Sequence, residues 1–377
     1  MTFNLLYFVS HPIQYQAPLL RKISADPDVN LTVVFESDFS SEGYLDEGFG
    51  VEVSWDVPLR EGYDSVLLAD VDPARYIAKA DAVWFHGWQS RQFRRLLNLA
   101  SAIGTPVLMR GENWAGAMPD ENGVRGWLKR LYLRRIFSKC NVYMAVGRAN
   151  RDYYINHGIS ESCIFDMPYA VDNNFFETNA TEESALEFRQ ELGIPNDQKI
   201  ILYAGKFTAR KRPESLLQAW EQADWLHDKR PALVFVGDGE RKQALLDASE
   251  RSAFKQDIYF TGFRNQTELP GVYRAAAIFV LASEKEPWGL GINEAMASGT
   301  SVIASDQCGA AFDLINEKTG LLVRSGDVAG LADALVESLE HSDEKGRAAK
   351  DRIAKWDFSA DIKGLKSALE YLAGVAK

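Results

Sequence analysis

The chain has 377 residues, of which 46% are hydrophobic and 25% are charged, so it is long enough for two or three globular domains and is not intrinsically disordered. Its net charge of −11 lacks the broad positive field that nonspecific binding to DNA or RNA requires, so nucleic acid is not an expected partner. No apolar run approaches the roughly 18 residues that span a bilayer, and the three cysteines lie far apart, without metal-ligand spacing. We therefore expect a protein of the cytoplasm or of the cytoplasmic face of a membrane.

Short apolar runs alternate with amphipathic helical patterns through the first half of the chain, which is typical of a parallel sheet covered by helices. The predicted strands are 5–10, 31–37, 82–87, 106–111 and 142–147, and the helical patterns lie near 18–25, 90–102, 125–138 and 148–157. Residues 37–72 fit this alternation poorly and predict loops or a short hairpin. The DVD triplet at 70–72 has the form of a metal-binding D-x-D pair, but no apolar strand leads into it, so we interpret it as a turn.

The same alternation starts again after an acidic segment at 173–184. The predicted strands of this second half are 199–205, 232–239, 258–263, 278–283, 301–305 and 320–325, and they are nearly continuous in apolar residues. The sequence thus predicts two doubly wound α/β domains, 1–174 and 175–357. A last amphipathic helix could pack on either domain, and we assign 358–377 to the first. Ligands of such sheets bind beyond the carboxyl ends of the strands, so the cleft between the two domains is the expected active site.

The stretch EKEPWGLGINEAMASGTSVIAS, 284–305, is the most informative part of the chain. Glu286 and Glu294 flank seven residues, and the glycine-rich turn 289–291 opens a predicted helix with Glu294 in its first turn. Free N–H groups at a helix start bind phosphate, and a carboxylate can accept two hydrogen bonds from a ribose diol. Taken one at a time, each glutamate is equally compatible with an ordinary strand–loop–helix turn.

A second stretch, YAGKFTARKRPESLLQAW, places cations directly after a predicted strand. The four cations are Lys206, Arg210, Lys211 and Arg212, and Pro213 then starts a helix. Cations at the carboxyl end of a parallel strand are well placed to bind a diphosphate. The alternative is a solvated basic loop.

Together, these two stretches resemble the retaining glycosyltransferases of family 4, which have the GT-B fold. The family pattern E-P-[FW]-G-L-x-x-x-E-A-M-A-x-G is matched at every fixed position by 286–299. The segment 235–245 resembles the turn that borders the nucleotide base, 167–176 the hinge that ends the first domain, and 319–335 the closing segment of the family. The resemblance is strong over the second domain and weak over the first.

The resemblance implies a role for particular residues of this chain. The implied catalytic residues are His86, Lys206, Lys211 and Glu286, and the implied donor contacts are Arg210, Gly237, Trp288, Gly289, Leu290, Gly291 and Glu294. Glu286 would contact hydroxyls of the donor sugar, Glu294 the ribose, and Lys211 the phosphates. Lys206 stands where the family usually has arginine, which keeps the charge but loses the bidentate fork, and Arg210 is the candidate to replace that fork.

The first domain departs from the family where a glycine-rich loop often follows the first strand. Here the sequence reads SHPIQYQAPL, which contains no glycine and resembles a subgroup of bacterial surface-polysaccharide glycosyltransferases. The candidate acceptor or phosphate contacts are His11, Gln14, Tyr15, Arg110 and Glu112. The same residues are also compatible with a packing role for His11 and with a local ion pair between Arg110 and Glu112.

These observations predict a retaining, metal-independent hexosyltransferase without a cofactor. It would move a sugar from a nucleotide-diphosphate donor of the UDP or GDP type to a glycan, lipid-linked or small-molecule hydroxyl, in the synthesis of cell-surface polysaccharide or glycoconjugates. The basic and apolar segment from Arg125 to Lys139 resembles a membrane-surface helix, although a core-packed helix would show a similar pattern. The sequence is also compatible with a sugar phosphorylase, a nucleotide-sugar epimerase or a non-catalytic subunit that binds a nucleotide sugar.

Overall fold

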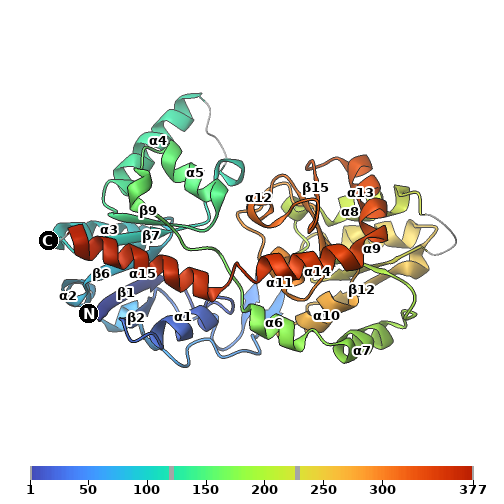
Figure 1. Ribbon diagram of the computed structural model, residues 1–377, viewed down its shortest axis with the longest axis horizontal. Helices are drawn as coiled ribbons and strands as arrows, with labels where there is room; N and C mark the ends of the chain where they lie inside the picture. The colour runs from blue at the N-terminus through green and yellow to red at the C-terminus, as the bar shows by residue number, and fades with distance from the viewer. Residues whose placement is uncertain (1, 119–122, 226–229, 376–377) are drawn as a thin grey trace. The chain divides into compact units, whose positions relative to one another are not determined.

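The computed structural model describes residues 2–118, 123–225 and 230–375, which form two compact units, each built on its own parallel sheet (Figure 1). Unit 1 takes in 1–44, 57–169 and 357–377, and unit 2 takes in 45–56 and 170–356. The α/β class with two Rossmann-like sheets agrees with the predicted fold class. The predicted boundary after residue 174 falls just inside unit 2, and the short segment 45–56, which the prediction placed in the first domain, packs with unit 2.

Unit 1 is built on a seven-stranded sheet in which every recorded strand pair is parallel. In spatial order its strands are β5 (Asp64–Leu67), β2 (Val29–Phe35), β1 (Phe3–Val9), β6 (Ala82–His86), β7 (Val107–Arg110), β8 (Val142–Ala145) and β9 (Ile164–Asp166). The chain order reverses between β1 and β6, which is the position where ligands bind to sheets of this kind. The central strands are apolar on both faces because helices cover both sides of the sheet.

The helices of unit 1 begin and end close to the predicted positions, except for α2, which was not predicted. They are α1 (Ala17–Ser24), α2 (Pro73–Lys79), α3 (Arg91–Ile103), α4 (Gly123–Phe137), α5 (Arg148–Asn156) and the C-terminal α15 (Phe358–Val375). Ser90 caps α3 by accepting hydrogen bonds from the N–H groups of Gln92 and Phe93, and Gly104 ends the helix in the left-handed conformation. Helix α15 lies against β8, β9 and α1, so the last helix of the chain packs on unit 1 (Figure 1).

Unit 2 is built on a six-stranded parallel sheet. In spatial order its strands are β12 (Ile258–Gly262), β11 (Ala232–Val236), β10 (Ile200–Ala204), β13 (Ile278–Leu281), β14 (Ser301–Ser305) and β15 (Gly320–Val323). Its helices are α6 (Asn173–Asn179), α7 (Glu182–Leu192), α8 (Pro213–Gln222), α9 (Lys242–Arg251), α10 (Leu269–Ala275), α11 (Leu290–Ala297), α12 (Ala311–Leu314), α13 (Val328–Glu340) and α14 (Ser342–Ile353). The order again reverses, between β10 and β13, and these are the two strands that lead into the cation stretch and the Glu286 stretch.

The irregular segment 37–72 contains the short hairpin that the sequence allowed. Its strands are β3 (Tyr44–Asp46) and β4 (Val51–Val53), which form a two-stranded sheet, and β5 follows as an edge strand of unit 1. Asp72 caps α2 by accepting a hydrogen bond from the N–H of Ala74, so the D-x-D triplet is a turn, as predicted. Sequence reasoning did not foresee β5 or β9, because both are short and only partly buried.

Candidate functional site

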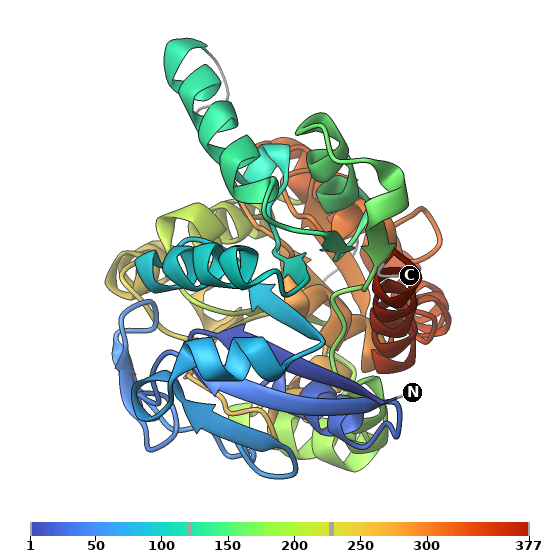
Figure 2. The same cartoon turned by 90° about the vertical axis from the view of Figure 1, so that its left-hand side faces the viewer.

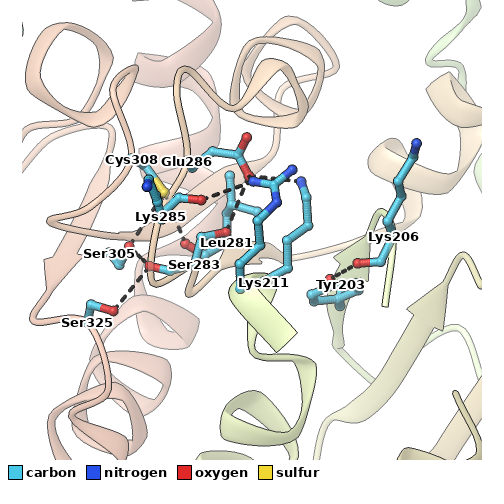
Figure 3. A network of polar contacts seen from close by, with 11 residues as sticks. Tyr203, Lys206, Lys211, Leu281, Ser283, Lys285, Glu286, Ser305, Cys308 and Ser325 are labelled. Carbon is cyan, nitrogen blue, oxygen red and sulfur yellow. Dashed lines mark hydrogen bonds and ion pairs between the residues drawn. The ribbon is translucent and has the colours of Figure 1, made fainter. Parts of the chain in front are cut away.

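The carboxylate of Glu286 is the centre of a charged cluster in unit 2. Its Oε2 lies 3.0 Å from Lys211 Nζ and 3.3 Å from Arg210 Nη1, and it accepts a hydrogen bond from Ser283 Oγ at 3.4 Å (Figure 3). Lys211 and Arg210 follow β10, whereas Ser283 and Glu286 follow β13. The reversal of strand order therefore brings the two predicted stretches together at one edge of the sheet.

The electrostatics of the cluster keep Glu286 ionised. Burial of the carboxyl acts to raise its pKa, but the neighbouring charges of Lys211 and Arg210 outweigh burial and hold the pKa of Glu286 below its usual value. An ionised carboxylate has only acceptor sites, so Glu286 can receive hydrogen bonds from hydroxyl groups and cannot donate a proton.

The loop that carries Glu286 is fixed by small polar side chains. Ser305 Oγ and Ser325 Oγ both donate to the carbonyl of Ser283, at 2.5 and 3.2 Å (Figure 3). Cys308 Sγ donates to the carbonyl of Leu281 at 3.6 Å, and burial raises the pKa of this thiol to about 12. Cys308 is therefore a protonated, small buried residue that supports the loop.

The glycine-rich turn begins α11 beside Glu286. Gly289 has φ +101°, and a Cβ at this position would lie 2.8 Å from Leu281 Cδ2 and 3.3 Å from Glu286 Cγ. Only glycine fits this conformation and spacing. Helix α11 starts at Leu290, with Gly291 next, so the N–H groups at its first turn lie where the prediction placed them.

Glu294 projects from the second turn of α11, one turn later than expected, since the helix starts at Leu290. Its Oε2 accepts a hydrogen bond from Tyr273 Oη at 2.7 Å. Burial raises the pKa of Glu294, and both the hydrogen bond from Tyr273 and the charge of Lys211 oppose this rise. Lys211 therefore acts electrostatically on both glutamates of the motif.

Lys206, the first of the four predicted cations, is not part of this cluster. Its ammonium lies 2.7 and 2.8 Å from the two carboxylate oxygens of Asp46 and 4.9 Å from the centre of the Phe49 ring. Figure 3 shows the side chain of Lys206 directed away from Glu286 and Lys211. The hairpin segment 45–56 thus supplies the counter-ion of a predicted catalytic residue.

Asp46→Asn is expected to lower stability by about 1 kcal/mol at neutral pH. Burial acts to raise the pKa of Asp46, but hydrogen bonds from Lys206 and from backbone N–H groups lower it below its usual value. A carboxyl whose folded-state pKa is depressed contributes stability above its unfolded pKa and loses it as pH falls through the folded pKa. The difference in unfolding free energy between wild type and variant should therefore shrink below about pH 4. A difference that does not change with pH in urea unfolding would contradict this assignment.

Two other predicted donor contacts have mainly structural surroundings. A Cβ on Gly237, at φ +132°, would lie 2.0 Å from the carbonyl oxygen of Gly205, so glycine lets the loops after β11 and β10 approach each other. Trp288 is only 2% exposed, donates to Asn293 Oδ1 at 2.9 Å and stacks on Trp356. The indole of Trp288 is packed inside unit 2, and its donor contact stays a prediction.

In unit 1, His86 lies at the matching reversal of strand order, at the end of β6. Its Nε2 is 3.7 Å from Glu112 Oε1, and its Nδ1 is 3.5 Å from Gln16 Nε2. Gln16 Oε1 accepts a hydrogen bond from Tyr7 Oη at 3.0 Å, and burial raises the pKa of Tyr7 so that it remains a donor. The amide nitrogen of Gln16 then faces His86 Nδ1, which favours the tautomer with the proton on Nε2, toward Glu112.

The turn after β1 lies beside this group. The Tyr15 ring meets the Tyr169 ring edge to face at 5.7 Å, and Tyr169 is also stacked against His86. Gln14 is half-buried on the same turn. His11 Nδ1 is 2.9 Å from Ser10 Oγ, and its ring lies 4.5 Å from that of Phe39.

Arg110 is the clearest departure from the predicted site. It is 1% exposed, and its Nη2 donates to Asp361 Oδ1 at 2.9 Å and to the carbonyls of Met167 and Pro168. The ion-pair partner of Arg110 is on α15 and is not Glu112, whereas its contact with acceptor or phosphate stays a prediction. Arg110 holds the C-terminal helix to unit 1.

Most of unit 2 is similar to a known protein family. Residues 184–356 match the family described as "Glycosyl transferases group 1". This segment is therefore similar to a glycosyltransferase group 1 domain. Over 218 residues the chain is 34% identical to the D-inositol 3-phosphate glycosyltransferase of Corynebacterium jeikeium, a match that covers 55% of this chain and 51% of that relative. The chain spans about half the length, or less, of the first curated relatives that it matches.

Solved structures extend the likeness in fold to both units. HepE of Anabaena, in complex with UDP and glucose, has a TM-score of 0.74 at 16% identity, over 98% of this chain and 100% of that chain. Sucrose-phosphate synthase of Thermosynechococcus elongatus has a TM-score of 0.68 at 19% identity, over 99% and 100%. At these identities the likeness establishes the GT-B fold of the chain.

Four residues of the two units were missed by sequence reasoning. They are Asp46, Tyr273, Gln16 and Asp361, each of which pairs with a predicted residue from a distant part of the chain. Local motifs contain no signal for such pairs, because the partners are brought together only by the order of the strands and helices. The backbone conformation of Arg212 was not predicted either. At φ +51°, Arg212 is the only non-glycine residue of the described chain with positive φ.

In the ranges 2–118, 123–225 and 230–375, no three His, Cys, Asp or Glu side chains are grouped so that they could hold a metal ion. In the same ranges, no helix has both the length and the apolar character to cross a bilayer.

Proposed function

We propose that the chain is a retaining, metal-independent glycosyltransferase that moves a sugar from a nucleotide-diphosphate donor to a hydroxyl acceptor. The observation that carries the proposal is the ionised Glu286, held between Lys211 and Arg210 at the glycine start of α11, with Glu294 on the same helix. The group 1 match of the segment that contains all four residues supports it.

Each part of this cluster suits one part of a nucleotide sugar. Glu286 can accept hydrogen bonds from the donor sugar hydroxyls, and Glu294 can accept them from the ribose diol. Lys211 has three N–H donors, so it can contact Glu286 and a phosphate oxygen together, and the first N–H groups of α11 can hold the other phosphate oxygens. Because HepE was solved with UDP, we propose UDP as the first nucleotide to test.

Bond cleavage at the anomeric carbon places negative charge on the leaving diphosphate. Lys211, Arg210 and the positive end of α11 would stabilise this charge as it develops. Glu286 is neutralised by two cations, which makes its carboxylate a weak nucleophile. We therefore favour front-face attack, in which the leaving phosphate takes the proton of the acceptor hydroxyl and no covalent glycosyl-enzyme forms.

The acceptor is proposed to be a glycan, a lipid-linked hydroxyl or a small polyol, in the synthesis of surface polysaccharide or glycoconjugates on the cytoplasmic side of a membrane. The curated relatives include D-inositol 3-phosphate glycosyltransferases, whose acceptor by name is a polyol phosphate. In unit 1, Glu112 and the Nε2–H of His86 form an acceptor and donor pair that suits a sugar hydroxyl. Lys206 would add to phosphate binding only after it leaves Asp46.

A thermal-shift screen of UDP, GDP and ADP, with CMP as the control, tests the donor site. A nucleotide diphosphate at about 100 times its dissociation constant should add about 2.7 kcal/mol of stability. Glu294→Ala should lose most of this stabilisation, because the ribose contact is removed and Tyr273 loses its partner. Glu250→Ala, which removes an exposed glutamate of α9, is the matched control and should respond like wild type.

A turnover assay separates a transferase from the competing activities. A transferase releases nucleotide diphosphate only when an acceptor is present. Sugar-1-phosphate formation from a glycan and free phosphate would indicate a phosphorylase, and conversion of the donor without any acceptor would indicate an epimerase. Tight nucleotide binding without turnover on any acceptor would indicate a non-catalytic subunit and would overturn the proposal.

A further inference from the structure

Helix α4 of unit 1 carries an exposed apolar stripe. Val124, Trp127, Leu128 and Leu131 follow the spacing i, i+3, i+4, i+7, so they lie along one side of the helix, with Tyr132 beside them. Their exposed fractions run from 43% for Leu131 to 75% for Val124. Among the described residues, eleven large hydrophobic side chains are exposed, and five of them are these. Such concentration on one helix is unusual for a surface that faces only water.

The opposite side of α4 packs against the core of unit 1. Leu133, Ile136 and Phe137 are buried in the core of unit 1, and all three belong to the C-terminal half of α4. The N-terminal half stands away from the rest of unit 1 in both views (Figures 1 and 2). The exposed stripe is therefore a second apolar face, additional to the one that packs on the sheet.

Cations surround this stripe, and no acidic residue interrupts it. The residues from 123 to 139 include five arginines and lysines within α4 and a further lysine after it, with no aspartate or glutamate. At 100° per residue, Arg125 and Arg134 fall on the two sides of the stripe and Arg135 at its C-terminal end. These three side chains are exposed. On a chain of net charge −11, this is a local positive surface on a negative molecule.

We propose that this face of α4 docks on an anionic lipid membrane. An apolar stripe with Trp and Tyr, flanked by Arg and Lys, has the chemistry of a helix that lies in the plane of the interface. The apolar side chains would enter the headgroup boundary while the arginines contact lipid phosphates. The net negative charge of the chain would be repelled by the same surface, which favours approach through this positive side of α4. The inference does not depend on the proposed transfer reaction.

Sedimentation of the full chain with vesicles tests the proposal. We expect binding to vesicles that contain phosphatidylcholine and phosphatidylglycerol, and at least about tenfold weaker binding to phosphatidylcholine alone or at high salt. Leu128→Ser combined with Leu131→Ser should reduce binding about tenfold by removing the inserted side chains. Arg134→Gln combined with Arg135→Gln should remove the preference for anionic vesicles.

Matched controls come from unit 2. Leu322→Ser, at an exposed leucine of β15, and Arg251→Gln, at an exposed arginine of α9, should bind vesicles like wild type. Failure of wild type to bind either vesicle, or equal binding by wild type and the stripe variants, would overturn the proposal. If light scattering shows that the stripe variants instead convert a dimer to a monomer, a second copy of the chain covers the stripe and the membrane proposal is wrong. UDP stabilisation should be unchanged in all these variants, so a failure here is distinguishable from a failure of the donor site.

Discussion

Lys211→Ala is expected to reduce kcat by about 10²–10³, corresponding to about 2.7–4 kcal/mol of transition-state stabilisation. Lys211 is the cation closest to Glu286, and it also acts electrostatically on Glu294. Its removal would take positive charge from the leaving phosphate and from the carboxylate that orients the sugar. Initial rates with saturating donor and acceptor measure the effect. Lys255→Ala, at an exposed lysine of unit 2, is the matched control and should retain the wild-type rate.

The pH dependence of this variant separates a catalytic role of Lys211 from a structural one. Lys211 is the largest of the charges that hold the pKa of Glu286 down, so its loss should raise that pKa. Since the ionised form of Glu286 is the active one, the acidic limb of the pH–rate profile should move to higher pH in Lys211→Ala. A variant that unfolds at the wild-type temperature and keeps wild-type kcat at every pH would contradict the site.

The strands of the second sheet could be predicted from the sequence because they are continuous apolar runs. The loops between them could be assigned because they contain a dense motif. Pro213 at the start of α8 and the glycines at the start of α11 mark these helices by local chemistry alone. Glu286 and Lys211 were each predicted to follow a parallel strand, and the structure shows that they pair there. The features that could be predicted are therefore those in which the role of a residue depends on its neighbours in the sequence.

The contacts that the sequence did not predict have a common physical origin, which is that many side chains are satisfied by partners far away in the sequence. Lys206 has the character of a site residue until Asp46, from a hairpin in the first half of the chain, neutralises it. Trp288 lies inside a motif, yet its ring stacks on Trp356, 68 residues later in the chain. Composition and spacing indicate which polar groups need partners, but only the three-dimensional structure shows which partners they have.

The largest effect on stability is expected from Arg110→Leu, which should destabilise unit 1 by about 3–5 kcal/mol, because it leaves a buried carboxylate without its counter-ion. Asp361 is fully buried, and its Oδ2 has no hydrogen-bond partner among the described residues. Burial raises the pKa of Asp361 to about 7, although the charge of Arg110 opposes the rise. Calorimetry of the full chain measures the loss, since it can resolve separate transitions of the two units.

The sign of the pH dependence tests this assignment further. A carboxyl whose folded-state pKa is raised binds more protons in the folded state, so it costs stability as pH rises from its unfolded value through its folded value. Without Arg110 the pKa of Asp361 should rise further, so Arg110→Leu should lose most stability at alkaline pH and least at acidic pH. Adding Asp361→Leu removes the unpaired carboxylate and should restore most of the loss, as replacement of buried ion pairs by apolar residues does elsewhere. If the double variant were no more stable than Arg110→Leu, the cost would lie in lost packing against Trp84 and Tyr169 and not in the buried charge.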